Sequence, residues 1–513
     1  MKVFVITLCL MLSFVTNTGH AQFKIAWANP KHDEKGNLLP LQSYGETIKR
    51  GMNFILEDQT SWAKGNKITT EEGKIRPPYF FYCLAFDGQL DGAGSSWTNC
   101  NTAYPAFHHA VFIQTFLDYY VYSGKEEALK RAEELAAWNI SHCTPLDWKY
   151  GGLPYSTLKN GKLGGSVDAD AIMTDKPAIM AGAYVRLFRT TGKQEYRNAA
   201  EQIASTLAKT QLPEGNWPFR VNPKTGEVRE GYTSSVIYAI ELFEQLDELA
   251  GEKRYAAAKA KALKWLLKGP VQTANWKGFY EDITTDEGQN NRTNFDCIDT
   301  ARYLLRHRDE NEKYLPLVLK LYDWVKKTFV DEKHTYGPAE AVREQLVCNV
   351  RMGVHSGHWA MLVAELFKAT GEERYRKDAL NTASYITYLL QPDNHISVGR
   401  EWHERECWYS CHFGAVFFLL ELVGYFPEAA PDGENHLLCG SAVVQTIRYE
   451  PNKVAYTTDG SSSDVLKLAF RPQEITVDGQ PLAAGDRGKK GWTFDAQTGI
   501  LRLVHDAGRV LIR

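Results

Sequence analysis

Acidic side chains near the starts of apolar segments are the first candidates for chemistry. Asp170 lies in GGSVDADAIM, Asp296 in NFDCID and Glu344 in VREQLVCNVRMGVHSGHW. Apolar surroundings raise the pKa of a carboxyl. A carboxyl that keeps its proton can donate it to a leaving oxygen while an ionised partner acts as base or nucleophile, which is what cleavage of a glycosidic bond requires. We therefore predict Glu344, Asp170 and Asp296 as catalytic residues.

Each of these acids has a structural alternative. Acidic residues near helix starts commonly serve as helix caps. Asp299 lies one helical turn from Asp296, so only one of the two needs to face a site.

Histidine, arginine and aromatic side chains accompany the acids. Imidazoles bind hydroxyls or transfer protons, arginine holds a carboxylate through two parallel hydrogen bonds, and aromatic rings can stack on sugar faces. Roles in the core or in surface salt bridges are the alternative for each residue. The predicted substrate-binding residues are His108, His109, Arg351, His358, Trp402, His403, Trp408 and Tyr409.

Two patterns bear on metal binding. His355 and His358 are three residues apart, but a zinc site needs at least a third protein ligand. Four residues separate Glu344 from Cys348, and likewise Cys407 from Cys411, so we expect one helical turn between the members of each pair. Three thiolates and a carboxylate could then hold zinc with one cysteine as nucleophile. The spacing is loose, and buried thiols explain it equally well. We predict no metal and no cofactor, and keep the zinc–cysteine site as an alternative.

Helical hairpins repeat through the middle of the chain. Turns such as TGKQEY and TGEERY recur, and Tyr196, Tyr255, Tyr314 and Tyr375 follow one another at 59, 59 and 61 residues. Apolar helices are expected near 105–122, 177–190, 232–249, 294–308, 355–369 and 408–425, and amphipathic partners near 45–58, 126–140, 195–210, 254–268, 312–328 and 373–390. Six of each predict a mainly α fold, an (α/α)6 toroid of six helical hairpins with the apolar helices inside. An open solenoid is the alternative.

The connections before the apolar helices are long and rich in Gly, Trp, Asp and Asn, whereas those after them are short. Long loops on one face of a rigid scaffold are where binding and catalytic residues concentrate. We therefore expect the site at the N-terminal ends of the inner helices.

The ends of the chain differ from its middle. Beyond Pro427, alternating runs such as KVAYTTD and ILRLVHD, separated by turns such as Asp478-Gly479, predict a small antiparallel β-domain. Lys2, the short apolar run after it and Gly19-His20-Ala21 predict a signal peptide. The expected organisation is a signal peptide at 1–21, the toroid at 22–430 and a β-sandwich-like domain at 431–513. We expect export, to a periplasm, with no membrane association after cleavage.

Composition narrows the function classes. The chain of 513 residues is 44% hydrophobic and 24% charged, with a formal net charge of -3. Nucleic-acid binding would need a basic face, which this balance does not indicate. The thirteen tryptophans and twenty-six tyrosines suit a saccharide ligand as well as a core.

The mature chain resembles the (α/α)6-toroid carbohydrate-active proteins of polysaccharide-degrading bacteria. The likeness rests on the TGKQEY and TGEERY turns and on the tail ENHLLCGSAVVQTIRYEPNKVAYTTDG. It includes exo-β-glucuronidase-type glycoside hydrolases, and it implies release of a uronic acid, β-linked glucuronic acid, from the ends of plant or microbial polysaccharide fragments by carboxylate acid/base catalysis. The implied partner is an acidic oligosaccharide or polysaccharide.

Other reactions share this fold, because one architecture hosts many chemistries. A polysaccharide lyase or a uronate epimerase would use Tyr and His for proton transfer. A β-L-arabinofuranosidase-like enzyme would use the zinc–cysteine set, although those proteins carry adjacent cysteines where this chain has Cys407-x-x-x-Cys411. A non-catalytic glycan-binding protein is the alternative from another class.

Overall fold

A computed structural model describes residues 26–58, 68–69, 75–76, 85–86, 102–159, 162–164, 170–400, 407–485 and 488–513. The predicted signal peptide at 1–21 and the candidates Trp402 and His403 lie outside the described residues. No helix of the described residues has the length and apolar character needed to cross a membrane.

Six largely buried helices form an inner layer. Each contacts the next along the chain, and the last contacts the first, so the contacts return to their starting point. They are α2 (Pro105–Ser123), α4 (Lys176–Thr191), α6 (Ile237–Ala250), α10 (Phe295–Arg306), α12 (Gly353–Thr370) and α14 (Tyr409–Tyr425). The sequence predicted all six, but α6 begins five residues later than expected because the backbone turns at Ser234–Val236 before the helix starts.

Amphipathic helices cover this layer from outside. Five of them follow an inner helix and pack against it, whereas α1 packs against α14 from the other end of the chain. The turns between partners contain Gly124, Gly192, Gly251 and Gly371, all in the left-handed conformation that stops a helix. The outer helices are α1 (Tyr44–Asn53), α3 (Glu126–Ser141), α5 (Gln194–Thr210), α7 (Ala256–Lys268), α11 (Tyr314–Phe329) and α13 (Glu373–Leu389).

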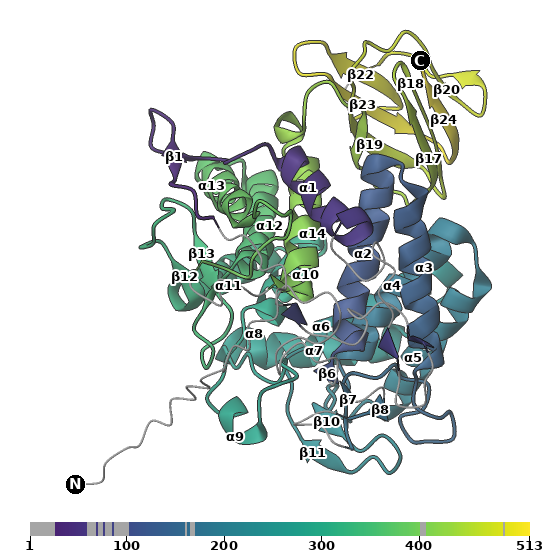
Figure 1. Cartoon of the computed structure of the whole chain (residues 1–513). Coiled ribbons are helices and arrows are strands. Elements are labelled where there is room, and N and C mark those ends of the chain that lie inside the picture. The colour runs from purple at the N-terminus through teal and green to yellow at the C-terminus, as the bar shows by residue number, and fades with distance from the viewer. Residues whose placement is uncertain are drawn as a thin grey trace.

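Among the described residues, the long connections before the inner helices contain two two-stranded antiparallel sheets, β3 (Ile68–Thr69) with β4 (Ile75–Arg76) and β5 (Ala85–Phe86) with β15 (Cys407–Trp408). They also contain three antiparallel sheets of three strands. The three-stranded sheets are β6 (Thr102–Ala103) with β7 (Leu158–Lys159) and β8 (Lys162–Leu163), β9 (Ile172–Met173) with β10 (Arg220–Val221) and β11 (Val228–Glu230), and β12 (Val330–Asp331) with β13 (Ala341–Arg343) and β14 (Arg351–Met352). Figure 1 places β6–β8 and β10–β11 at the end of the helical layer opposite the C-terminal strands. We call this end of the helical layer, which carries the long connections and the N-termini of the inner helices, the loop end.

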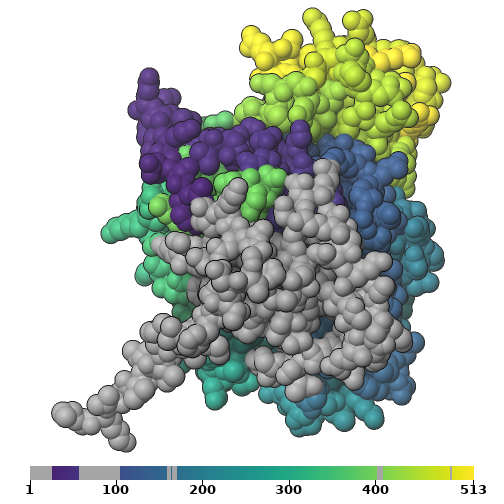
Figure 2. All heavy atoms as spheres, viewed as in Figure 1, coloured from purple at the N-terminus to yellow at the C-terminus, as the bar shows by residue number. Residues whose placement is uncertain are grey.

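The C-terminal region forms two antiparallel sheets, which confirms the predicted β-structure. One has the order β16–β19–β23–β22 and the other β17–β18–β24–β20–β21. Their strands are β16 (His436–Cys439), β17 (Val444–Glu450), β18 (Lys453–Thr458), β19 (Ser462–Lys467), β20 (Ile475–Val477), β21 (Gln480–Pro481), β22 (Gly491–Asp495), β23 (Ile500–His505) and β24 (Gly508–Ile512). Figures 1 and 2 show them as a lobe at one end of the molecule. The domain boundary at 430/431 stays a prediction.

This lobe is joined to the inner helices by specific contacts. The ring of His436 stacks on Tyr122 of α2 with centroids 3.8 Å apart, and Tyr449 donates a hydrogen bond of 2.6 Å to the carbonyl of Val121. Arg189 of α4 binds Asp459 with Nε 2.6 Å from Oδ2. The lobe therefore lies on the C-terminal ends of the inner helices, away from the loop end.

Candidate functional site

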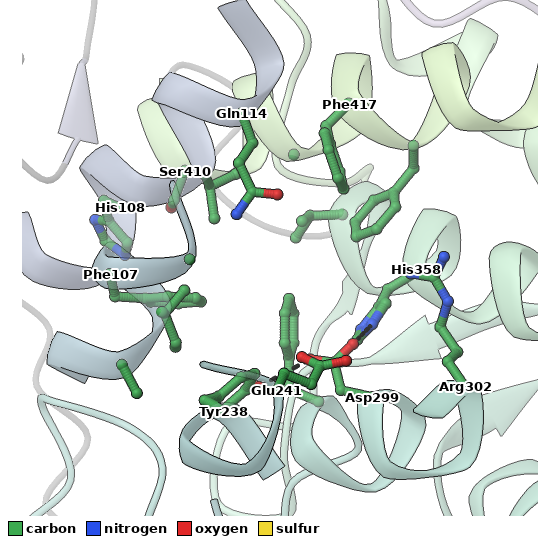
Figure 3. A pocket seen from close by; sticks show the side chains of 18 of the residues that line it. Phe107, His108, Gln114, Tyr238, Glu241, Asp299, Arg302, His358, Ser410 and Phe417 are labelled. Carbon is green, nitrogen blue, oxygen red and sulfur yellow. Dashed lines mark hydrogen bonds and ion pairs between the residues drawn. The ribbon is translucent and has the colours of Figure 1, made fainter. Parts of the chain in front are cut away.

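A cavity of about 750 Å³ lies among the inner helices (Figure 3). One face of α4 lines it, with Ile179, Gly182, Arg186 and Arg189 at helical spacing. Eleven residues separate Ala178 from Arg189, so this wall extends for roughly 16 Å along the helix at 1.5 Å per residue. The cavity therefore extends from the loop end towards the C-terminal sheets, with room for a saccharide.

Glu344 lies at the loop end of this cavity, directly after β13. Its backbone carbonyl accepts hydrogen bonds from the Tyr280 hydroxyl at 2.9 Å and from Asn294 Nδ2 at 3.0 Å. Burial raises the pKa of its carboxyl to about 7; the nearby acids Asp282 and Glu281 also raise it, while hydrogen bonds from Cys348 and Gln345 lower it. A large fraction of Glu344 thus holds its proton at neutral pH, as a general acid must.

Two further acids, Glu281 and Asp282, line the same end of the cavity. Burial raises the pKa of Glu281 to about 7, against the opposing effect of Lys176, and the pKa of Asp282 is raised too. They were not among the predicted catalytic residues, because they stand in a loop whose sequence has no periodicity. The signal available was their position directly after Phe279-Tyr280, where an acidic pair follows two large rings.

The other two predicted catalytic acids lie elsewhere. Asp170 is exposed, bound to Arg229 at 2.7 Å, and is not part of the cavity lining. Asp296 is fully buried behind the lining, where it accepts hydrogen bonds from the hydroxyls of Ser234 and Ser235, and burial raises its pKa to about 7. The structure thus brings neither of them to the cavity surface beside Glu344.

Asp299, one turn after Asp296, is the acid of α10 that faces the cavity. It accepts a hydrogen bond of 2.6 Å from His358 Nε2 and one of 2.8 Å from the Tyr238 hydroxyl. Burial alone would raise its pKa, but His358, Arg302 and Tyr238 together lower it below the ordinary range. Figure 3 shows Asp299, His358 and Glu241 facing the same space. Asp299 is therefore an ionised carboxylate in the cavity wall.

The remaining predicted histidines differ in position. His355 and His108 line the cavity, and burial lowers the pKa of each ring to about 3, helped by His358 in one case and Lys176 in the other. His355 also binds Asn294 Oδ1 through Nδ1 at 3.0 Å. His109 points instead to the outer layer, with Nδ1 2.8 Å from Asn139 Nδ2. Both lining rings are neutral at pH 7, so they are suited to hydrogen bonding, whereas a pKa near 3 makes each a weak proton acceptor.

Of the predicted arginine and aromatic residues, some line the cavity and others lie outside its lining. Arg351 binds Asp331 at 2.5 Å and is not part of the cavity lining. Trp408 lines the cavity, whereas Tyr409 is buried beside it and lies outside the lining. The structure therefore leaves Trp408 as the described aromatic candidate that can touch a ligand.

The cysteine pattern is not helical. Glu344 and Cys348 lie in the loop between β13 and β14, and Cys407 belongs to strand β15 (Cys407–Trp408) while Cys411 belongs to α14, so the inference of one helical turn between each pair was wrong. Cys348 does hydrogen-bond to Glu344, and Cys411 lines the cavity. Among the described residues, no three His, Cys, Asp or Glu side chains are grouped so that they could hold a metal.

Comparisons with known proteins reach only the fold. No protein-family model and no curated protein matches this sequence. A cellobiose 2-epimerase from Bacillus thermoamylovorans superposes with a TM-score of 0.52 at 12% identity over 73% of this chain and 99% of its own. A D-mannose isomerase gives 0.52 at 15% identity over 74% and 97%, and a sugar epimerase from a ruminal bacterium 0.51 at 14% over 73% and 98%. These solved structures are α/α-toroid carbohydrate enzymes, and at such identities the likeness concerns the fold alone.

Proposed function

We propose that this protein is a carbohydrate-processing enzyme of the (α/α)6-toroid architecture, and that it hydrolyses a glycosidic bond in the cavity. The observation that carries the proposal is Glu344, a buried carboxyl with a pKa of about 7 beside two other acids at the cavity wall. Its proton is available for the leaving oxygen, and Glu281 or Asp282 is available to activate water or attack the sugar. Trp408 supplies a ring for stacking.

The charge of the sugar is a separate matter. The described lining contains eight carboxylates and four arginines, and each arginine binds a carboxylate: Arg186 with Asp118, Arg189 with Asp459, Arg302 with Glu365 and Glu421, and Arg306 with Glu241. Arg351, a predicted substrate-binding residue, and Arg343 both bind Asp331. Release of glucuronic acid stays a prediction, and with the described arginines it requires that one of these ion pairs opens.

Product analysis tests the proposal directly. The mature protein would be incubated with matched aryl β-glucosides, β-glucuronides and α-L-arabinofuranosides, and with neutral and acidic oligosaccharides. We expect free monosaccharide from at least one of them, with preference for a neutral sugar if the arginine pairs stay closed. Binding without any change in the ligand would overturn hydrolysis in favour of a glycan-binding protein, and new ultraviolet absorbance from a C4–C5 double bond would show a lyase. Export to the periplasm is part of the proposal and is checked by N-terminal sequencing of the secreted chain.

A second candidate reaction is epimerisation or isomerisation of a sugar. His355 and His358 lie three residues apart on α12 and both line the cavity, with one ring neutral and the other bound to an ionised Asp299. In this arrangement His358, oriented by Asp299, would take the proton from carbon, and His355 would hydrogen-bond the substrate. Solvent deuterium appearing at a sugar carbon without cleavage of a glycosidic bond would identify this reaction.

A further inference from the structure

Lys176, the first residue of α4, is completely enclosed just behind the loop end of the cavity. Its ammonium lies 3.4 Å from the centroid of the Phe279 ring and 4.8 Å from that of Phe107. Two carboxylates share it: Nζ is 3.2 Å from Asp175 Oδ2 and 3.9 Å from Glu281 Oε1. A cation so placed is stabilised by the ring faces and by the acids together.

The enclosed cluster holds more acid than base. Asp175, Glu281 and Asp296 are each at most 5% exposed and surround the single ammonium. Among the described residues, Oε1 of Glu281 and Oδ1 of Asp296 have no hydrogen-bond partner, although both side chains are buried. Buried charges that are incompletely hydrogen-bonded depend on one another for their ionisation, so these groups share protons.

Of this cluster, Glu281 is the member that also lines the cavity. Its neighbour Glu344 is in a different electrostatic setting, because the charged groups that act on it are Asp282 and Glu281, both acidic. Hence Glu281 has a buried cation, Lys176, as its counter-charge, whereas the charged groups that act on Glu344 are all acidic.

We propose that Lys176 is a positioning residue that decides which of these carboxyls loses its proton: Glu281 ionises and acts as the base or nucleophile, and Glu344 keeps its proton and acts as the acid. This rests on the proposed function, since it assigns the two roles within that site. With Glu281 as nucleophile, Glu344 protonates the leaving oxygen and then takes a proton from the water that hydrolyses the glycosyl–enzyme ester, which restores both groups. With Glu281 as base, the proton of the attacking water goes to Glu281, and the pair is restored when Glu281 releases a proton to solvent and Glu344 takes one up.

Other titratable groups face the cluster from each neighbouring element. They are His108 from α2, Asp175 from the start of α4, Asp282 from the loop after Phe279, Asp296 from α10 and Glu344 from the end of β13. Lys176 is the one cation acting on Glu281 among them, because His108 is neutral at its lowered pKa. Removing the lysine charge therefore acts first on Glu281.

The test compares Lys176→Met with Lys176→Arg through the pH profile of kcat/KM on a substrate that the product analysis identifies. Loss of an adjacent opposite charge moves a carboxyl pKa by about one to three units, so Lys176→Met should shift the acidic limb upward by at least about one unit. Lys176→Arg keeps the charge and should leave that limb within about half a unit of wild type. Lys277→Met, a nearby lysine outside the cluster, is the matched control and should move neither limb. An activity loss that is equal at every pH, with both limbs in place, would overturn the assignment.

A second measurement needs no activity. Removing the lysine leaves extra buried acid, and Glu281→Gln removes one of those acids, so the double variant Lys176→Met/Glu281→Gln should unfold at a higher denaturant concentration than Lys176→Met alone. Additive effects of the two changes would overturn the coupling. If the stability effects of the two changes are coupled but the protein turns over no saccharide, the charge interaction between Lys176 and Glu281 stands and only the proposed function is overturned. If Lys176→Met does not fold, the pH profile of kcat/KM is measured for Glu281→Gln instead. Loss of the acidic limb in that variant supports Glu281 as the base, and an acidic limb that persists shows that another group is the base.

Discussion

Arg302 joins three inner helices from within, and its removal should destabilise the whole helical layer. Its Nε lies 2.9 Å from Glu365 Oε1 on α12, and its Nη2 lies 3.2 Å and 3.3 Å from the two carboxylate oxygens of Glu421 on α14. The guanidinium itself belongs to α10 and is 8% exposed. In Arg302→Met the two glutamates would remain without their shared cation.

The size of the effect follows from this arrangement. Breaking a buried ion pair by removing one partner costs about 3–5 kcal/mol. Glu365 retains the Tyr425 hydroxyl at 2.8 Å and Arg306 at 4.0 Å, and Glu421 is partly open to the cavity. We therefore expect the lower end, about 3 kcal/mol at pH 7, and a smaller loss at pH 5, because Glu421, whose pKa is raised by burial, can then take up a proton.

Urea unfolding followed by far-ultraviolet circular dichroism measures this loss. Arg308→Met is the matched control, because Arg308 lies on the same segment but is partly exposed. It ion-pairs with the exposed Asp309 at 4.0 Å and donates a hydrogen bond of 3.1 Å to the Leu305 carbonyl, so its loss should change stability by no more than about 0.5 kcal/mol. Equal losses in the two variants, or a loss in Arg302→Met that grows as the pH falls, would refute the reasoning.

Three further changes test other parts of the structure. Gly278 has φ +77°, and a Cβ there would lie 2.4 Å from the Tyr232 carbonyl oxygen. Gly278→Ala should therefore lower the free energy of unfolding by more than about 1 kcal/mol and reduce turnover by displacing Glu281. Gly36→Ala, at the same φ but with no atom within 4 Å of the added Cβ, should lower stability less and leave turnover unchanged; urea unfolding and steady-state kinetics measure both variants. Burial alone would lower the pKa of His505, but hydrogen bonds to Asp464 Oδ2 at 2.7 Å and to the Asp506 carbonyl at 2.6 Å raise that pKa above its ordinary value. The protonated ring therefore stabilises the folded state fully below about pH 6.5, the pKa in the unfolded chain, and this stabilisation is lost as the pH rises through the higher pKa of the folded state. The difference in melting temperature between wild type and His505→Gln should therefore shrink from pH 6 to pH 9, and a constant difference would contradict this. Trp408→Ala should raise KM by up to about tenfold with little change in kcat, measured by steady-state kinetics, if its ring stacks on the sugar.

Much of the fold was predictable because its signals are local. Apolar periodicity and the recurring Gly before four of the amphipathic helices located the inner and outer helices to within about five residues, as Gly192 and Gly371 illustrate. The alternating runs after His436 likewise predicted antiparallel strands. The small sheets at the loop end were missed, because pairings such as Val342 with Met352 join strands of two or three residues.

The site was only partly predictable, because its members come from segments far apart in the sequence. Glu344 was identified from its setting, but Glu281 and Asp282 lie in a loop without periodicity, and their approach to Glu344 depends on how that loop packs. The choice between Asp296 and Asp299 needed the rotation of α10 about its axis, which a difference of one turn in sequence does not give. Asp170 is the opposite case. Its neighbours in sequence are mostly uncharged, which suggested a buried carboxyl, but in the structure its side chain is exposed and forms an ion pair with Arg229.

The central claim, that Glu344 donates a proton to a leaving oxygen, is tested most directly by comparing Glu344→Gln with wild type on two aryl glycosides of the same sugar. One would carry a poor leaving group such as phenol and the other a good one such as 2,4-dinitrophenol, which departs without protonation. We predict that kcat falls by about 10²–10⁴ on the first substrate and by less than about tenfold on the second, with an unchanged unfolding midpoint. Equal losses on the two substrates, or near-normal turnover of the phenyl glycoside, would contradict the account.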